Sequence, residues 1–454
     1  MIPETKRKGA TPEANALYRE KLSQMIRCKT VWTPQGENEG EFLRFYSVIE
    51  TLFPHLTAKA KKLTFGGGCF VYVLEGKNAT KNIMLMSHHD VVEGSSDWQT
   101  DPFEPVEKDG YLYGRGTIDT KTPLFAQLQA AEELLAEGYE PEGINLYIGS
   151  SNNEEVCGDG MVLATEYFQQ QGIRFYAVVD EGGAITQGQI PGVKCKSAVV
   201  AVHEKSRHMF RCKAELDTKG HGGFGGSKDS AIERLSRFIT EVSDKKDKIY
   251  KGKFYPEVRA TFERHVPYMS FPMNLLFGNM GLFAPVIKKI MMGIPAASAM
   301  LSTGLSFTTV TAGDTQQPQI RGKSAETTMF LRCVREEDLY AGLEKIKAIG
   351  AKYGVTIEQI ERDYCEPTDF HGEAYQTVEA LLHENFPEVA VVPFLLTAGT
   401  DARRFTDVAD NILRFAPIDL SKKQFATIHA ADEHIGIENI GQCVVFYKDL
   451  IRRF

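Results

Sequence analysis

The apolar residues between positions 83 and 180 change their spacing in a regular order, and this order restricts the fold more than any other feature of the chain. Short apolar runs indicate buried strands, and apolar residues at helical spacing indicate the helices between them. The predicted elements are a strand at 83–86, a helix at 122–138, a strand at 144–148, a helix at 159–171 and a strand at 175–179. This alternation is typical of an α/β fold, a mainly parallel sheet with helices on its faces.

The sequence pattern changes after about residue 206 and returns near residue 366. The middle region predicts strands near 209–216, 305–312, 324–334 and 354–364, and helices at 230–242 and 337–352. Strands and helices in this order suggest a smaller α+β lobe inserted into the first domain. We therefore predict one domain made of residues 1–206 and 366–454, interrupted by a second domain at 207–365.

The charge of the chain restricts its partners. It carries 52 Lys and Arg residues against 60 Asp and Glu residues, a formal net charge of −8. Nucleic acids and anionic membranes attract clustered positive charge, so we expect neither as a partner and expect a small molecule instead. Residues 266–313 are apolar, but Lys288, Lys289 and several prolines interrupt them, which favours a buried or partner-facing insertion over a membrane span.

The cysteines and the first residues bear on the location of the protein. The eight cysteines include no CxxC pair, and the basic residues near the start are not followed by an apolar stretch. The chain therefore resembles neither a disulfide framework nor a secretory signal. We predict reduced thiols and a cytoplasmic location.

Polar side chains gather where the predicted strands end. They are His88 and Asp90, Asp119 before the first helix, Asn152, Asn153, Glu154 and Glu155, and Asp180 and Glu181. In open α/β sheets ligands bind in the crevice beyond the carboxyl ends of the strands, so we expect these groups to face one crevice. Carboxylates and imidazoles that converge from several segments can bind a cation such as Zn²⁺.

The spacing of these residues suggests separate roles around such a cation. His88 and Asp90 lie two apart on a strand, so they point the same way and Asp90 can accept the second imidazole N–H. Asp119, just before a helix, can offer one oxygen to each of two metals. Of the adjacent acids Glu154 and Glu155, one can bind metal while the other takes a proton from the attacking water.

Five segments in order make the interpretation more specific: SHHDVV, DPFEPVEKDGYLYGRGTIDTK, NNEEVCGDG, VVDEGG and HAADEHI. In order and spacing they resemble the di-zinc metallopeptidase and deacylase family of carboxypeptidase S, aminoacylase, glutamate carboxypeptidase and succinyl-diaminopimelate desuccinylase. The resemblance runs from about residue 12 to the end of the chain. It implies a zinc exopeptidase-like catalytic domain, with the inserted lobe as a lid and dimerisation domain.

The resemblance also implies a role for each motif residue. One zinc would be bound by His88, Asp119 and Asp180, and the other by Asp119, Glu155 and His429. Co²⁺ or Mn²⁺ could replace zinc. The catalytic residues would be Glu154 as general base, Asp90 to orient His88, and His221 of the GHGG segment at 220–223 to stabilise the oxyanion. The substrate-binding residues would be Arg332, Gly399 and Thr400.

Several choices stay open on the sequence alone. His89 competes with His88, but strand alternation turns it away from Asp90. Glu181 could bind metal in place of Asp180. Asp180 is favoured because it stands at the end of the strand. His221 could act within its own chain or across a homodimer formed by the lid. The chain also departs from the family at Gln319 and Gly322, where relatives carry Asn-x-x-Pro in the lid.

We therefore expect a zinc-dependent hydrolase that cleaves a peptide or N-acyl amide bond of a small substrate with a free carboxylate. The long segment at 250–310 resembles the enlarged lid of carboxypeptidase S-like members, which favours blocked dipeptides or N-acyl amino acids. The alternatives are a di-zinc aminopeptidase or dipeptidase, and a peptide-binding homologue without catalysis. The second alternative is disfavoured because the metal ligands and the base are all present.

Overall fold

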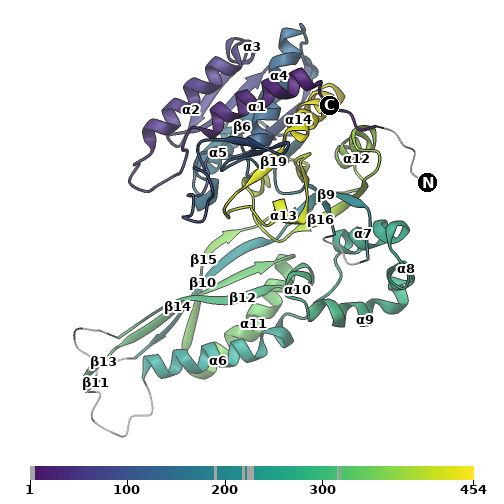
Figure 1. Ribbon diagram of the computed structural model, residues 1–454. Helices are drawn as coiled ribbons and strands as arrows, with labels where there is room; N and C mark the ends of the chain where they lie inside the picture. The colour runs from purple at the N-terminus through teal and green to yellow at the C-terminus, as the bar shows by residue number, and fades with distance from the viewer. Residues whose placement is uncertain (1–5, 189–191, 217–219, 222–229, 314–315, 317–318) are drawn as a thin grey trace.

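The computed structural model describes residues 6–188, 192–216, 220–221, 230–313, 316 and 319–454. A ten-stranded sheet forms the larger part of the molecule, at the top of Figure 1. Its strands, in order across the sheet, are β1 (Lys61–Phe65), β2 (Cys69–Leu74), β6 (Glu142–Ser150), β3 (Lys77–Met86), β7 (Ala177–Asp180), β17 (Ile412–Arg414), β9 (Lys196–Glu204), β8 (Ile185–Gln187) and β18 (Asp419–Leu420), with β16 (Ala390–Leu396) also on β9. The central strands β6, β3, β7 and β17 run parallel.

Helices cover both faces of this sheet. The covering helices are α1 (Pro12–Ile26), α2 (Glu39–Leu52), α3 (Pro54–Lys59), α4 (Lys121–Ala136), α5 (Gly160–Gln170), α12 (Glu373–Asn385) and α14 (Ile437–Arg453). Alternate residues of β3 enter two different cores: Ile83 and Leu85 pack with α4 and α14, whereas Met84 and Met86 pack with α5. A strand buried on both faces is what the continuous apolar run at 83–86 predicted.

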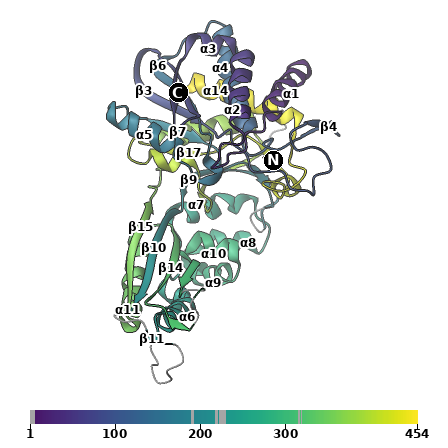
Figure 2. The same ribbon diagram turned by 90° about the vertical axis from the view of Figure 1, so that its left-hand side faces the viewer.

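A separate four-stranded antiparallel sheet, with two helices on one face, projects below the large sheet in Figure 1 and is called the lid here. Its strands, in order, are β12 (Gly304–Ala312), β14 (Ser324–Cys333), β10 (Ser206–Glu215) and β15 (Val355–Asp363), and its helices are α6 (Ala231–Ile249) and α11 (Glu336–Tyr353). The short strands β11 (Gly220–His221) and β13 (Ile320–Arg321) pair at the far end of the lid (Figures 1 and 2).

The segment between α6 and β12 forms α7 (Pro256–His265), η2 (Val266–Tyr268), α8 (Met273–Gly278), α9 (Met280–Met292) and α10 (Pro295–Leu301). One side of α9 is buried through Met280, Ile287 and Met291. Its other side leaves Leu282 74% and Ile290 57% exposed, so the insertion is only partly buried. Among the described residues, no helix has the length and the apolar character needed to span a membrane.

The predicted fold class, a mainly parallel α/β sheet with a smaller inserted α+β lobe, is confirmed. The lid strands lie between Ser206 and Asp363, while the domain boundaries at 206 and 365 stay a prediction. One local interpretation was wrong in detail. The sequence pattern places Thr122 at the N-cap of the first predicted helix, but this helix begins at Lys121, and the Thr122 hydroxyl donates to the Thr117 carbonyl.

Candidate active site and metal centre

The predicted site residues lie where parallel strands of the large sheet end. His88 follows β3, Glu154 opens the short helix η1 (Glu154–Val156) after β6, and Asp180 ends β7. Because β3 runs parallel to both β6 and β7, their carboxyl ends share one edge of the sheet. Asp119 stands before α4, and His429 arrives on the turn between α13 (Lys422–Phe425) and β19 (His434–Gly436). Segments far apart in sequence therefore converge here.

Asp119 lies between two imidazoles. Its Oδ1 is 3.0 Å from His88 Nε2, and its Oδ2 is 3.0 Å from His429 Nε2. The same His429 nitrogen is 3.1 Å from Glu155 Oε2. Ligand atoms of His88, Asp119 and Glu155 all lie within 4.8 Å of one another. One carboxylate that faces a histidine with each oxygen has the geometry needed to bridge two cations.

The donor set fits divalent cations on independent grounds. Glu155 Oε1 is buried and has no hydrogen-bond partner among the described residues. Burial raises the pKa of Glu154 and of Glu181 well above the ordinary glutamate value. Hydrogen bonds to Asp119 and Glu155 raise the pKa of His429 to about 10. Burying a carboxylate is unfavourable unless its negative charge is balanced. A cation bound by imidazole nitrogen and carboxylate oxygen would balance that charge.

Asp90 supports the site from beneath. It is fully buried, and its carboxylate accepts hydrogen bonds from the backbone N–H groups of Glu154 (3.1 Å) and Glu155 (3.0 Å). His88 Nδ1 lies 2.9 Å from the Asp90 carbonyl oxygen and 3.5 Å from its Oδ1. His88 therefore pairs with the backbone carbonyl of Asp90, while the Asp90 carboxylate fixes the backbone that carries both glutamates. The orienting role of the carboxylate stays a prediction.

Asp180 and Glu181 lie differently in the structure. Both Asp180 oxygens accept backbone hydrogen bonds, from Glu181 N and Ala402 N, each at 2.9 Å, and burial raises the pKa of Asp180 to about 7. Glu181, in contrast, lines the same cavity as His88 and Asp119. The choice of Asp180 as the metal ligand stays a prediction.

Two neighbouring residues show how the site is held. His89, the competitor of His88, is fully buried; its ring lies parallel to Phe45 and Phe70, and burial lowers its pKa well below the ordinary value. Glu433, which the sequence analysis missed, is buried and accepts hydrogen bonds from the backbone N–H of Ile118 and Asp119. Its only sequence signal was an acid in the same motif as His429.

A cavity of about 290 Å³ opens over these residues. Its polar lining residues include His88, Asp119, Glu154, Glu155, Glu181 and His429. Its apolar lining residues include Leu396, Ala398, Ile418, Leu420, Phe425 and Ile428. The predicted substrate residues Gly399 and Thr400 line the same cavity. A cavity lined by both charged and apolar groups suits an amphipathic substrate.

Arg332, the third predicted substrate residue, comes from β14 of the lid and lies against the loop that carries Gly399 and Thr400. A Cβ added to Gly399 would stand 2.9 Å from Arg332 Nη2 and 2.5 Å from Arg403 Nη1. Arg332 Nε is buried without a hydrogen-bond partner among the described residues. Two guanidinium groups therefore adjoin the loop, where a carboxylate could be bound.

His221 is not brought to this cavity. The strand β11 that carries it lies at the end of the lid remote from the large sheet (Figures 1 and 2). Gly222 and Gly223 of the same GHGG segment lie outside the described residues.

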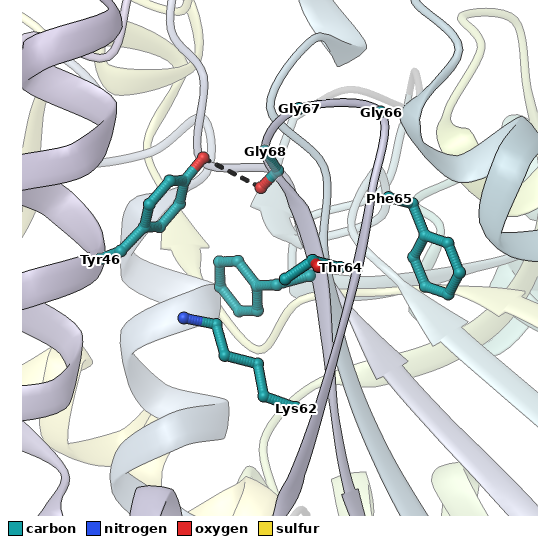
Figure 3. Close-up of a pocket in the computed structure, with 8 residues that line it drawn as sticks. Tyr46, Lys62, Thr64, Phe65, Gly66, Gly67 and Gly68 are labelled. Carbon is teal, nitrogen blue, oxygen red and sulfur yellow. Dashed lines mark hydrogen bonds between the residues drawn. The ribbon is translucent and has the colours of Figure 1, made fainter.

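A second pocket of about 290 Å³, shown in Figure 3, lies between α2 and the β1–β2 turn, away from the metal-ligand candidates. Tyr46 donates a hydrogen bond of 2.9 Å to the Gly68 carbonyl (Figure 3). The Lys62 side chain extends along the rings of Tyr46 and Phe70. Lys62 Nζ is already engaged, 5.4 Å from the Tyr46 ring centroid and 3.3 Å from Glu50. We assign this pocket no role.

Comparisons with known proteins agree with the geometry. The profile of peptidase family M20/M25/M40 matches residues 84–453. The N-fatty-acyl-amino acid synthase/hydrolase PM20D1 of Mus musculus is 26% identical over 97% of this chain and 88% of its own length. The probable carboxypeptidase S-like 2 of Dictyostelium discoideum is 27% identical over 95% of this chain and 84% of its own length.

Solved structures show the same fold. The M20 family metallo-carboxypeptidase Sso-CP2 of Sulfolobus solfataricus superposes with a TM-score of 0.65 at 17% identity, covering 96% of this chain and 98% of that one. Bacillus subtilis YXEP, described as a dinuclear metal-binding peptidase, superposes with a TM-score of 0.57 at 12% identity, covering 97% and 99%.

Proposed function

The chain belongs to peptidase family M20/M25/M40, and we propose that it is a two-zinc enzyme that cleaves the amide bond of an N-acyl amino acid or blocked dipeptide. Its family and its curated relatives make it a metallo-hydrolase of amide bonds. The observation that carries the proposal is Asp119, whose two oxygens face His88 and His429 beside the unpartnered Glu155 oxygen.

We assign the ligands from this geometry. One zinc would be bound by His88, Asp119 and Glu181, and the other by Asp119, Glu155 and His429. Three carboxylates against two divalent cations leave the centre with a net charge of about +1 by simple charge counting. When bound, the metals supply the positive charge that polarises the scissile carbonyl and acidifies water.

The remaining chemistry falls to Glu154. It lines the cavity, and its Oε2 is 4.0 Å from His88 Nε2, close to the metal-ligand candidates. We propose that it takes the proton of the attacking water and delivers it to the leaving amine. Burial raises its pKa, which favours uptake of that proton. Asp90 holds the Glu154 backbone in place for both transfers.

The substrate class follows from the residues that line and adjoin the cavity. The apolar lining residues, including Ile418, Leu420 and Phe425, suit an acyl chain or an apolar side chain. The guanidinium groups of Arg332 and Arg403 beside Gly399 suit a free carboxylate. An aminopeptidase would instead need an acid free to bind an α-amine, and the acids of the cavity are already assigned to metal and proton transfer. The relatives' printed activities, on N-fatty-acyl amino acids, support this choice.

A substrate panel tests the proposal. Purified protein should contain zinc and hydrolyse N-acyl amino acids, and conversion of the substrate carboxylate to an amide should lower kcat/KM by about 10²-fold, because Arg332 would lose its anionic partner. The panel pairs each N-acyl amino acid with its amide and with a dipeptide that has a free amine. Equal turnover of acid and amide, or a requirement for the free amine, would contradict the proposal.

Two matched variants test the assignment of Glu181 over Asp180. Glu181→Gln should lower the zinc content from two ions to about one per chain, because a carboxylate ligand is lost. Asp180→Asn should keep both ions, since Asp180 accepts only backbone hydrogen bonds. Elemental analysis of the folded variants decides, and loss of zinc from Asp180→Asn alone would restore the original prediction.

Two further proposals concern assembly and location. We propose a homodimer in which His221 of one lid reaches the cavity of the other chain, supported by the remote position of β11. Size-exclusion chromatography with light scattering would contradict it by finding only monomer.

A cytoplasmic location is supported by the eight cysteines, all of which are free thiols. Export of the full-length protein from its cell would contradict that.

A further inference from the structure

The chain passes from the large sheet into the lid and later returns. A buried carboxylate stands at each of these two crossings. Glu204 is the last residue of β9 in the large sheet, and only Lys205 separates it from β10 in the lid. On the return, Asp363 is the last residue of β15. Glu204 is completely buried and Asp363 is 7% exposed. Buried carboxylates require partners, so the groups they contact identify what the crossings hold.

Glu204 holds the loop that carries the predicted substrate residues. Its Oε2 accepts hydrogen bonds from Thr400 N (3.2 Å) and from Thr400 Oγ1 (2.9 Å). The same oxygen accepts from Arg414 Nε at 2.6 Å, and Oε1 lies 3.6 Å from Arg403 Nη1. Arg414 alone would provide charge compensation. The two additional bonds to Thr400 fix the position of a residue in the wall of the cavity.

Asp363 holds the same loop from the second crossing. Its Oδ2 accepts from Arg403 Nε at 2.6 Å and lies 3.2 Å from Arg404 Nη1. Arg403 in turn donates to the Thr400 carbonyl at 2.8 Å. Both crossings are therefore joined through the 399–404 loop, and the loop cannot shift without disturbing charge pairs at both.

These contacts fix the position of the 399–404 loop relative to the lid. Gly399 lies against the guanidinium ends of Arg403 of its own loop and Arg332 of the lid, and a Cβ at this position would require them to shift. We propose that Glu204 is a positioning residue that fixes the 399–404 loop against the lid, and so sets the gap in which Arg332 meets the substrate carboxylate. The role of Arg332 in this statement rests on the proposed function, whereas the effect of Glu204 on the loop does not.

The test compares Glu204→Gln with Glu257→Gln. Glu257 is also buried and charge-paired, to Arg335 and His203, but it touches no residue of the loop. In Glu204→Gln we expect amide exchange of the 397–404 segment to accelerate about tenfold and KM for an N-acyl amino acid to rise about tenfold, because a charged acceptor is lost, with kcat and zinc content retained. Glu257→Gln should lower thermal stability and leave both quantities unchanged.

Unchanged exchange and unchanged KM in folded Glu204→Gln would overturn the proposal, as would equal changes in both variants. If Glu204→Gln does not fold, Thr400→Val removes one of the two loop bonds without unpairing an arginine, and exchange and KM should change in the same direction. Should the wild-type protein hydrolyse no member of the panel, the proposed function fails, while the exchange measurement still decides the role of Glu204.

Discussion

Replacing Glu154 by Gln should lower kcat by roughly 10³-fold while both zinc ions stay bound, because general acid–base catalysis contributes on the order of 10²- to 10⁴-fold. Gln keeps the shape of the side chain and loses only the group that accepts a proton. Glu154 contacts the ligands without being assigned to either metal, so the metal content should not fall. The measurements are kcat and KM on an N-acyl amino acid, with zinc content on the same sample.

Glu166→Gln is the matched control for this prediction. Glu166 lies on the exposed side of α5, close in sequence to the η1 glutamates but outside the cavity. It should leave kcat and zinc content unchanged. Full activity in Glu154→Gln would contradict the assigned base, and loss of zinc would instead make Glu154 a metal ligand.

Mixing two inactive variants should restore activity if the cavity is completed by a second chain. His221→Ala should lower kcat by about 10²-fold or more through loss of an oxyanion donor. In a heterodimer of His221→Ala with Glu154→Gln, one cavity has an intact Glu154 and receives an intact His221 from the partner chain. Random exchange of subunits should then restore about a quarter of the wild-type activity, since half the dimers carry one such cavity.

The control for the mixing experiment is two preparations of the same variant, which should stay inactive. Heterodimers must also be demonstrated directly, with chains of different mass. No recovery of activity in demonstrated heterodimers would contradict action across the dimer. It would argue instead for a site completed within one chain.

The family and the central strands could be predicted because they depend on local signals. Buried parallel strands give continuous apolar runs, as at 83–86, and metal ligands follow the ends of such strands in a fixed order. The sequence analysis therefore brought His88, Asp119, Glu155 and His429 together, as the structure does.

What could not be predicted depends on tertiary contacts. Asp180 and Glu181 are adjacent acids at a strand end, and only the backbone donors Glu181 N and Ala402 N show which one faces inward. Glu433 holds the Asp119 turn from more than 300 positions away, without any pattern to mark it. The apolar 266–313 segment left open a buried or a partner-facing position, and only the structure shows that one side of α9 is exposed.

Anomalous diffraction from crystals of the native protein, collected above and below the zinc edge, tests the two-zinc centre most directly. The account predicts two peaks that share Asp119, one also contacting His88 and Glu181 and the other contacting Glu155 and His429. A map without zinc peaks at this edge of the sheet, or with a single peak that does not touch Asp119, would contradict it.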